Sequence, residues 1–238
     1  MGEPQLYPIS IAMDNQQNLN TRRNFIGKLA AGAAALSLAP ILSAYKPEST
    51  ISNKAALRSE AEEWIDKIKG KHKMVFDITR VSDGHYLFSM DAFLSTNNDT
   101  GTPDDELGVV GVLRSGGIAL ALKDEMWEKF KLGEMLKITD PLTKAPAIRN
   151  MFWKPKEGDD CYPDKSIDKL MKHGVLFGVC EKALGGWSEK IAADMKLKDH
   201  EVKKELKENI LHDIQLVPSG VWALGRAQEK GCTYCYAG

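Results

Sequence analysis

The sequence lacks an excess of charge of either sign and lacks a hydrophobic run long enough to cross a membrane. Its 238 residues hold 32 Lys and Arg against 33 Asp and Glu, which gives a formal net charge of −1. That balance gives no reason to expect nucleic-acid binding or attraction to acidic lipids. The apolar, Ala-rich stretch at 29–42 is short of the ~20 residues that span a bilayer, so we expect no membrane span in the mature chain.

Motifs for common cofactors and metals are also missing. The chain has neither a GxGxxG pattern nor a P-loop, which disfavours dinucleotide and nucleoside-triphosphate binding. No two of Cys161, Cys180, His85 and His173 stand at a spacing that recurs in structural zinc sites. We therefore expect no cofactor and no metal. A composition that is 43% hydrophobic and 27% charged is that of a soluble globular protein of one or two domains.

The first 45 residues resemble a targeting segment. Arg22 and Arg23, followed by Phe25-Ile26, precede the apolar stretch, and small residues suited to cleavage follow at 42–44. This order resembles a twin-arginine export signal, which a receptor reads as an address. We interpret 1–45 as a signal peptide and expect a periplasmic location, where disulfides persist. The alternative is a plain buried helix beside two surface arginines.

Apolar runs alternate with helical patterns through the rest of the chain. Residues 46–72 are expected to form a polar linker, over 46–58, and a leading amphipathic helix, over 59–69, with Ser59 and Glu62 as a capping box. The elements predicted beyond them are strands at 73–80, 107–113, 175–180, 214–218 and 232–236, and helices at 84–96, 117–130, 181–211 (one broken or two successive) and 219–230. Near-continuous apolar strands in this order predict an α/β fold with three αβα layers and a mainly parallel sheet of about five strands.

One segment interrupts the predicted domain at 73–238. Residues 131–165 contain four prolines and the acidic cluster at 157–160, and they fit no regular pattern. We expect this segment to be an excursion over the domain surface, since loops of such length are usually functional or mobile.

Candidate ligand-binding residues follow the predicted strands. Parallel α/β sheets bind ligands beyond the carboxyl ends of their strands, which singles out Cys180 and a further group, namely His85, Arg114, Ser115, Gly116 and Ser219. The backbone N–H groups at 115–117, between a strand and a predicted helix, suit an anion, to which Arg114 adds charge. The alternatives are that Arg114 pairs with a nearby carboxylate and that His85 caps a helix.

Cysteine chemistry gives the sharpest hypothesis. If Glu181 opens a helix, the unpaired N–H groups and the helix dipole favour a thiolate at Cys180, whereas the Glu181 carboxylate opposes it if both side chains point the same way. The alternative is a cysteine that only fills the core. Cys232 and Cys235 lie three apart in a predicted strand and so point to opposite faces, which disfavours a shared disulfide or metal. Pairing across chains or with Cys161 stays open.

The chain from 73 to 238 resembles the DsrE/DsrF-like family, which has the YchN-type fold. The resemblance rests on three stretches: 108–114 running into 118–127; the Gly-Val strand that ends in Cys within 170–180; and the Val-Pro-Ser-Gly-Val and Gln-Glu-Lys-Gly motifs within 216–231. It implies an α/β domain that assembles into homo-trimers or homo-hexamers. It also implies that Cys180 carries sulfane sulfur as a persulfide, with a sulfur-donor or sulfur-acceptor protein as partner.

Two functions follow as hypotheses. The first is an exported sulfur (persulfide) carrier or sulfur-compound-binding protein that acts through Cys180. The second is a non-enzymatic oligomeric binding module for a small anion or other ligand, or a structural subunit of a periplasmic assembly. If the protein is an enzyme, the resemblance implies sulfur transfer.

Overall fold

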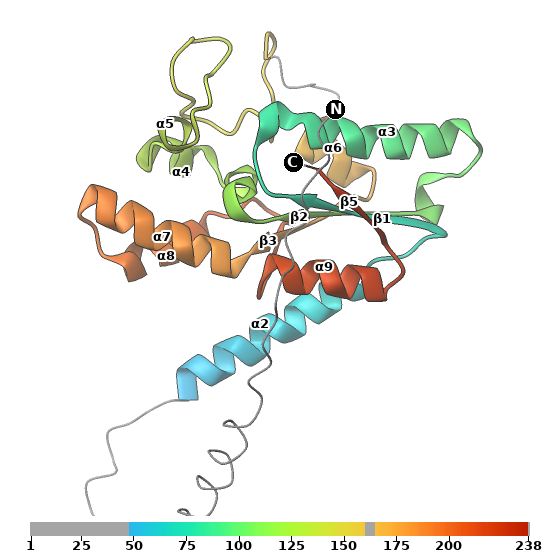
Figure 1. Cartoon of the computed structure of the whole chain (residues 1–238), viewed down its shortest axis with the longest axis horizontal. Helices are drawn as coiled ribbons and strands as arrows, with labels where there is room; N and C mark the ends of the chain where they lie inside the picture. Colours follow the sequence, from blue (N-terminus) through green and yellow to red (C-terminus); the bar gives the residue numbers. More distant parts are fainter. Residues whose placement is uncertain (1–47, 160–164, 238) are drawn as a thin grey trace, which may run out of the picture. The chain divides into compact units, whose positions relative to one another are not determined.

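A computed structural model gives the structure of residues 48–159 and 165–237 (Figure 1). The predicted signal peptide at 1–45 and Cys161 lie outside these described residues. In chain order the elements are α2 (Glu48–Asp66), β1 (His72–Ile78), η1 (Ser82–Gly84), α3 (His85–Asp99), η2 (Asp104–Glu106), β2 (Leu107–Leu113), η3 (Ser115–Ala121), α4 (Asp124–Lys129), α5 (Leu132–Leu136), α6 (Ile167–Lys172), β3 (Leu176–Cys180), α7 (Glu181–Met195), α8 (Asp199–Glu208), β4 (Gln215–Val217), α9 (Gly220–Glu229) and β5 (Thr233–Tyr236).

The five strands form one sheet in the order β4-β3-β2-β1-β5, and every pair in it is parallel. This confirms the predicted α/β fold with a five-stranded parallel sheet. The central strand β2 is buried at all seven positions, as expected of a parallel strand covered on both faces. In register, Val75 of β1 lies beside Val110 of β2 on one side and Tyr234 of β5 on the other.

Helices cover both faces of the sheet and complete the three layers. In Figure 1, α3 and α6 lie above the sheet, and α2 and α9 lie below it. Alternate strand residues accordingly pack into two cores: Phe76 and Phe177 join Met90 of α3 in one, and Val75 and Val112 join the α2 and α9 side chains in the other.

A glycine allows α2 to come this close to the sheet. A Cβ on Gly178 of β3 would lie 2.7 Å from Cη2 of Trp64, so the indole ring packs directly on the strand backbone.

Three predicted elements need correction. Residue 48 already starts α2, so most of the predicted linker at 46–58 is helical and Ser59 lies inside the helix instead of capping it. The predicted helix at 117–130 is instead η3 followed by α4, because backbone hydrogen bonds from Lys123 to Asn209 and from Leu211 to Ala121 hold the segment between them extended. The six-residue α6 was not predicted. The break predicted within 181–211 is confirmed, since α7 and α8 are two successive helices.

The predicted excursion has a buried ionic centre of its own. Arg149 donates from Nε to Asp140 and from Nη1 to Asp159, both at 2.8 Å. The two carboxylate side chains are 3% and 0% exposed. Asp140 also accepts the N–H groups of Leu142 and Thr143. Up to residue 159, the segment is therefore built around a fixed charge cluster.

This charge cluster sets the pKa of both carboxyl groups. Burial acts to raise the pKa of Asp140, but hydrogen bonds from Arg149 and from two backbone N–H groups outweigh it, so the pKa is lowered. The Arg149 hydrogen bonds lower the pKa of Asp159 against the opposing effect of burial. Both groups therefore favour the folded state most when they are ionised.

Replacing Arg149 by Leu should destabilise the protein by about 3–5 kcal/mol, because two buried carboxylates lose their partner. Urea unfolding at neutral pH measures the loss. The control is Lys204→Met, which removes an exposed pair with Glu208 and should cost less than about 0.5 kcal/mol. Below pH 3.8, the ordinary pKa of these carboxyl groups, the difference in unfolding free energy between wild type and Arg149→Leu should narrow. The reason is that stabilisation by a lowered pKa is lost as the pH falls through the pKa of the folded state. A difference in unfolding free energy that stays constant with pH would contradict this account.

Candidate functional site

The predicted site residues all lie along the carboxyl edge of the sheet. Ser219 follows β4, Cys180 ends β3, Arg114 follows β2, and His85 opens α3 after β1. Because β4, β3, β2 and β1 are neighbours in the sheet, these residues are neighbours along one edge although they are far apart in the sequence. Position alone does not decide what each does, so each side chain has to be followed to its contacts.

Cys180 stands where β3 ends and α7 begins. Its Sγ accepts a hydrogen bond from the Ala183 N–H at 3.3 Å, and its backbone is still extended. Since Gly178 meets Trp64 of α2, the alternation of strand side chains turns Cys180 to the same face, which α2 and α9 cover. The residue is 6% exposed. The thiol therefore has the predicted place at a helix start and is also covered.

The neighbouring carboxylate does not act on the thiol as an unpaired charge. Glu181 forms a close ion pair with Lys207 of α8, and both side chains are partly buried. Its negative charge is thus directed towards α8 and compensated there.

Arg114 is engaged by a carboxylate, as the alternative interpretation held. Its Nε donates to Asp77 Oδ1 at 2.6 Å and its Nη2 to Oδ2 at 2.8 Å. The two bonds form a bidentate arginine–carboxylate pair. Tyr234 of β5 donates its hydroxyl to the same Oδ2 at 2.8 Å. The Arg114 stem packs on the start of α9, where a Cβ on Gly220 would come within 2.8 Å of the Arg114 Cβ.

This cluster changes the proton affinity of its members. Hydrogen bonding to Asp77 raises the pKa of Arg114, against the effect of burial. The hydrogen bond to Asp77, with smaller effects from burial and from the Asp77 charge, raises the pKa of Tyr234. Asp77 is 1% exposed, so Arg114 and Tyr234 supply the partners that a buried carboxylate needs.

The other predicted ligand residues do not join this cluster. Ser219 caps α9, where its Oγ accepts the Trp222 N–H at 3.2 Å. Gly116 lines a separate hollow of about 300 Å³ with Ser82 and Asp83. Ser115 is exposed and has a left-handed backbone with φ 50°. His85 is the exposed first residue of α3.

Part of the reason to expect an anion site at 115–117 does not hold in the structure. No α-helix starts there, and the Gly117 N–H already donates to the carbonyls of Thr79 and Arg114.

A larger hollow lies beside the start of α7, and we call it the basic groove. It measures about 940 Å³ and includes Glu181 and Pro218, the residues directly after β3 and β4. Five cations line it against two carboxylates, Glu181 and Glu189; the cations are Lys54, Arg58, Lys182, Lys203 and Arg226. Arg58 pairs with Glu62 and Arg226 with Glu229, which lie outside the lining. The Arg226 guanidinium lies 5.6 Å from the ring centre of Trp222, which also lines the groove. The groove therefore offers positive charge and an aromatic wall next to the first turn of α7.

Sequence reasoning missed the partners that organise this edge. Asp77 had a signal, because it is the charged residue inside the apolar run 74–78. The alternating charges at 196–208 are typical of a solvated helix face, yet Lys203 lines the basic groove and Lys207 pairs with Glu181. Alternating charges on a helix do not tell which of them face another element.

The remaining cysteines behave as the spacing suggested. Cys232 packs into the core beneath α2 and α9, whereas Cys235 packs against the opposite core. Cys180, Cys232 and Cys235 are free thiols, and burial raises the pKa of Cys232.

The described ranges hold neither a group of metal-binding side chains nor a helix that could span a membrane. Within residues 48–159 and 165–237, no three His, Cys, Asp or Glu side chains are grouped to hold a metal ion. In the same ranges none of the helices has both the length and the apolar character that a bilayer crossing requires.

Comparisons with known proteins add little to this geometry. No family model and no curated protein match the chain. Among solved structures, it is similar to a protein of unknown function, MTH1491 from Methanobacterium thermoautotrophicum, with 14% sequence identity and a TM-score of 0.39. That similarity covers 70% of this chain and 100% of the other.

The interaction between Asp77 and Tyr234 can be tested directly by titrating Tyr234. Tyr234 should ionise above the ordinary tyrosine value of 10.0, and Asp77→Asn should lower its pKa, because the phenol loses a charged acceptor while Arg114 stays nearby. Near-ultraviolet titration measures tyrosine ionisation, and the difference from Tyr234→Phe assigns the signal. Circular dichroism checks that each variant is folded. An unchanged Tyr234 pKa in folded Asp77→Asn would show that the two side chains do not interact.

Proposed function

We propose that this protein is an exported, periplasmic DsrE-like sulfur carrier that holds sulfane sulfur on Cys180. The observation that carries the proposal is the position of the Cys180 Sγ, which accepts the Ala183 N–H at the start of the 15-residue helix α7. Unpaired N–H groups and the dipole at a helix start favour a thiolate, which is the nucleophilic form. The sequence resemblance to the DsrE/DsrF-like family at this strand end supports the same assignment.

The chemistry is a transfer of one sulfur atom. The Cys180 thiolate attacks the outer sulfur of a donor persulfide, R–S–SH, and forms a new S–S bond. The bond between the two donor sulfurs breaks, and the donor leaves as the thiolate R–S⁻. The transferred sulfur keeps its proton and its oxidation state, so the products are the Cys180 persulfide and R–S⁻, and no other oxidant or reductant is needed.

The basic groove suits the substrates of such a reaction. Persulfides, polysulfides and thiosulfate are anions, and the groove places several cations beside Glu181, the residue directly after Cys180. Because Glu181 is paired with Lys207, its charge repels an incoming anion less. We propose that sulfur compounds reach the covered Cys180 thiol from this groove when side chains over it move aside, with the first turn of α7 and its N–H groups kept in place.

A second candidate function is favoured by the 6% exposure of Cys180. In that case the thiol fills the core, and the basic groove binds a small anion without any covalent step. Under either function we propose a homo-oligomer, trimer or hexamer, as the family resemblance implies. The exposed side chains of Val221, Tyr234 and Tyr236 support it, since exposed apolar groups gather at subunit contacts.

Mass spectrometry of the intact protein after exposure to polysulfide distinguishes these functions. We expect a mass increase of one or more sulfur atoms on Cys180, which cyanide or a thiol reductant reverses. Cys180→Ser should remove this adduct. Lys182→Gln with Lys203→Gln should slow its formation, whereas the exposed control Lys204→Gln should not. Sulfur on other cysteines alone would refute the carrier function.

A further inference from the structure

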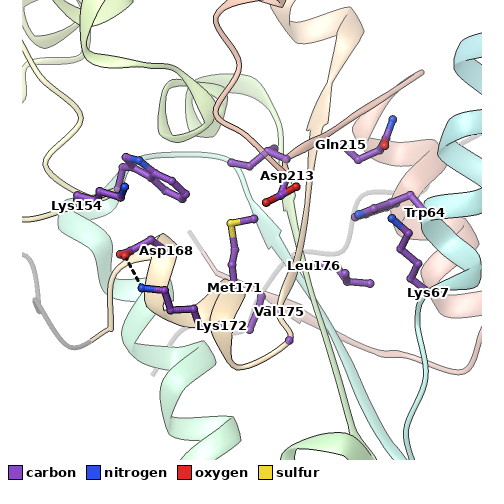
Figure 2. A pocket seen from close by; sticks show the side chains of 13 residues that line it. Trp64, Lys67, Lys154, Asp168, Met171, Lys172, Val175, Leu176, Asp213 and Gln215 are labelled. Carbon is purple, nitrogen blue, oxygen red and sulfur yellow. Dashed lines mark hydrogen bonds and ion pairs between the residues drawn. The ribbon is translucent and has the colours of Figure 1, made fainter.

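A second large hollow lies at the opposite, amino edge of the sheet (Figure 2). It measures about 690 Å³ and is bounded by α2, by α6, by the segment after α5 and by the first residues of β3 and β4. We call it the tryptophan hollow, and the residues that matter for its chemistry are Trp64, Lys67, Trp153, Lys154, Met171 and Leu176. Because it lies beyond the amino ends of the strands, it is separate from Cys180 and the basic groove.

One hydrogen-bond donor in the hollow has no acceptor. Trp64 is 3% exposed, and its indole N–H has no hydrogen-bond partner within the part of the chain that the structure describes. The far side of its ring packs on Gly178. In Figure 2 the nitrogen end of this ring is turned towards the middle of the hollow, across from Asp213. The nitrogen is itself covered, so an acceptor reaches it only when the ring shifts towards the hollow. Buried polar groups are nearly always paired in proteins, and this donor therefore favours a ligand that brings an acceptor.

The charges in the hollow leave a positive excess. Asp168 is paired with Lys172 at 3.4 Å. Asp213 lies 2.6 Å from His212, which balances its charge only when the imidazole is protonated. The lining therefore holds three lysines against two aspartates. Lys67 and Lys154 have no carboxylate within ion-pair distance among residues 54–159 and 165–237. Lys67 is the first residue after α2, and its backbone N–H donates to the Trp64 carbonyl at 3.1 Å, so the two residues lie in one turn of the chain. An anion at this place therefore meets an ammonium group and an indole N–H together.

The rest of the lining is apolar and partly aromatic. Trp153 is half-buried, and the Lys154 ammonium lies 5.5 Å from its ring centre. Met171, Val175 and Leu176 add apolar surface. An inorganic ion would leave these groups unused, whereas small-molecule sites combine an apolar lining with a few placed polar groups.

We propose that the tryptophan hollow binds a small aromatic carboxylate. Its carboxylate accepts the Trp64 N–H and pairs with Lys67. Its ring lies against Trp153 and Met171, and Lys154 adds charge at the opening. The proposal does not depend on the function of Cys180.

Nuclear magnetic resonance of the indole N–H groups tests the proposal on the full chain. The probes are benzoate, acetate (the anion without the ring) and benzyl alcohol (the ring without the charge). Benzoate should shift the indole signal that is absent in Trp64→Phe, whereas acetate and benzyl alcohol should bind at least about tenfold more weakly. No shift of the Trp64 signal with millimolar benzoate would overturn the proposal.

Variants distinguish specific binding in the tryptophan hollow from non-specific binding of benzoate. Trp64→Phe keeps a ring on Gly178 but removes the donor, and it should weaken benzoate binding about tenfold, as expected for a hydrogen bond to a charged group. Lys67→Gln combined with Lys154→Gln should weaken binding at least as much, and this pair replaces Trp64→Phe as the test if that variant does not fold. The control Lys169→Gln, an exposed residue of α6 that does not line the hollow, and Cys180→Ser should bind as wild type does. Equal binding by all variants would overturn the proposal.

Discussion

The parallel pairing of all five strands is the constraint on which the rest of the structure depends. Parallel neighbours need a crossover between them, so each connection carries helices over a face of the sheet and the central strand β2 becomes buried along its whole length. The same pairing gathers the carboxyl ends of the strands at one edge. Cys180, Arg114 and Asp77 are neighbours there because of strand order alone. The amino ends gather at the opposite edge, where the tryptophan hollow lies.

Electrostatics then divides the carboxyl edge into two parts. A carboxylate at Asp77 is tolerated in a buried strand only because Arg114 and Tyr234 bond it. Arg114 is therefore not available as a free cation for a ligand. Further cations lie along α2, α7, α8 and α9 in the basic groove, where Arg58 and Arg226 pair with carboxylates but Lys182 and Lys203 have no ion pair among the described residues. Our proposal therefore places the chemistry on the β3 and β4 side of this edge, where Cys180 lies.

The fold followed from the sequence more readily than the site did. Unbroken apolar runs such as 107–113 indicate buried parallel strands, and their order gives the layers. The helix at 117–130 was wrong because backbone hydrogen bonds to residues 209–211 hold the chain extended between η3 and α4, and no local pattern contains that contact. For the same reason the partners of Arg114 and Glu181 were not foreseen, since Asp77 and Lys207 are distant in sequence. The place of Cys180 at a helix start was local information, and it was predicted.

The alkylation rates of Cys180 and Cys232 in the native full chain test the central claim most directly. Both residues are 6% exposed, so simple accessibility gives them equal rates. The Cys180 Sγ accepts a backbone N–H at a helix start, whereas burial raises the pKa of Cys232. With iodoacetamide at neutral pH and peptide mass spectrometry as readout, our account predicts that Cys180 is modified well before Cys232. Equal rates for the two, or reaction of Cys180 only when the whole protein unfolds, would contradict a reactive thiol at the carboxyl edge.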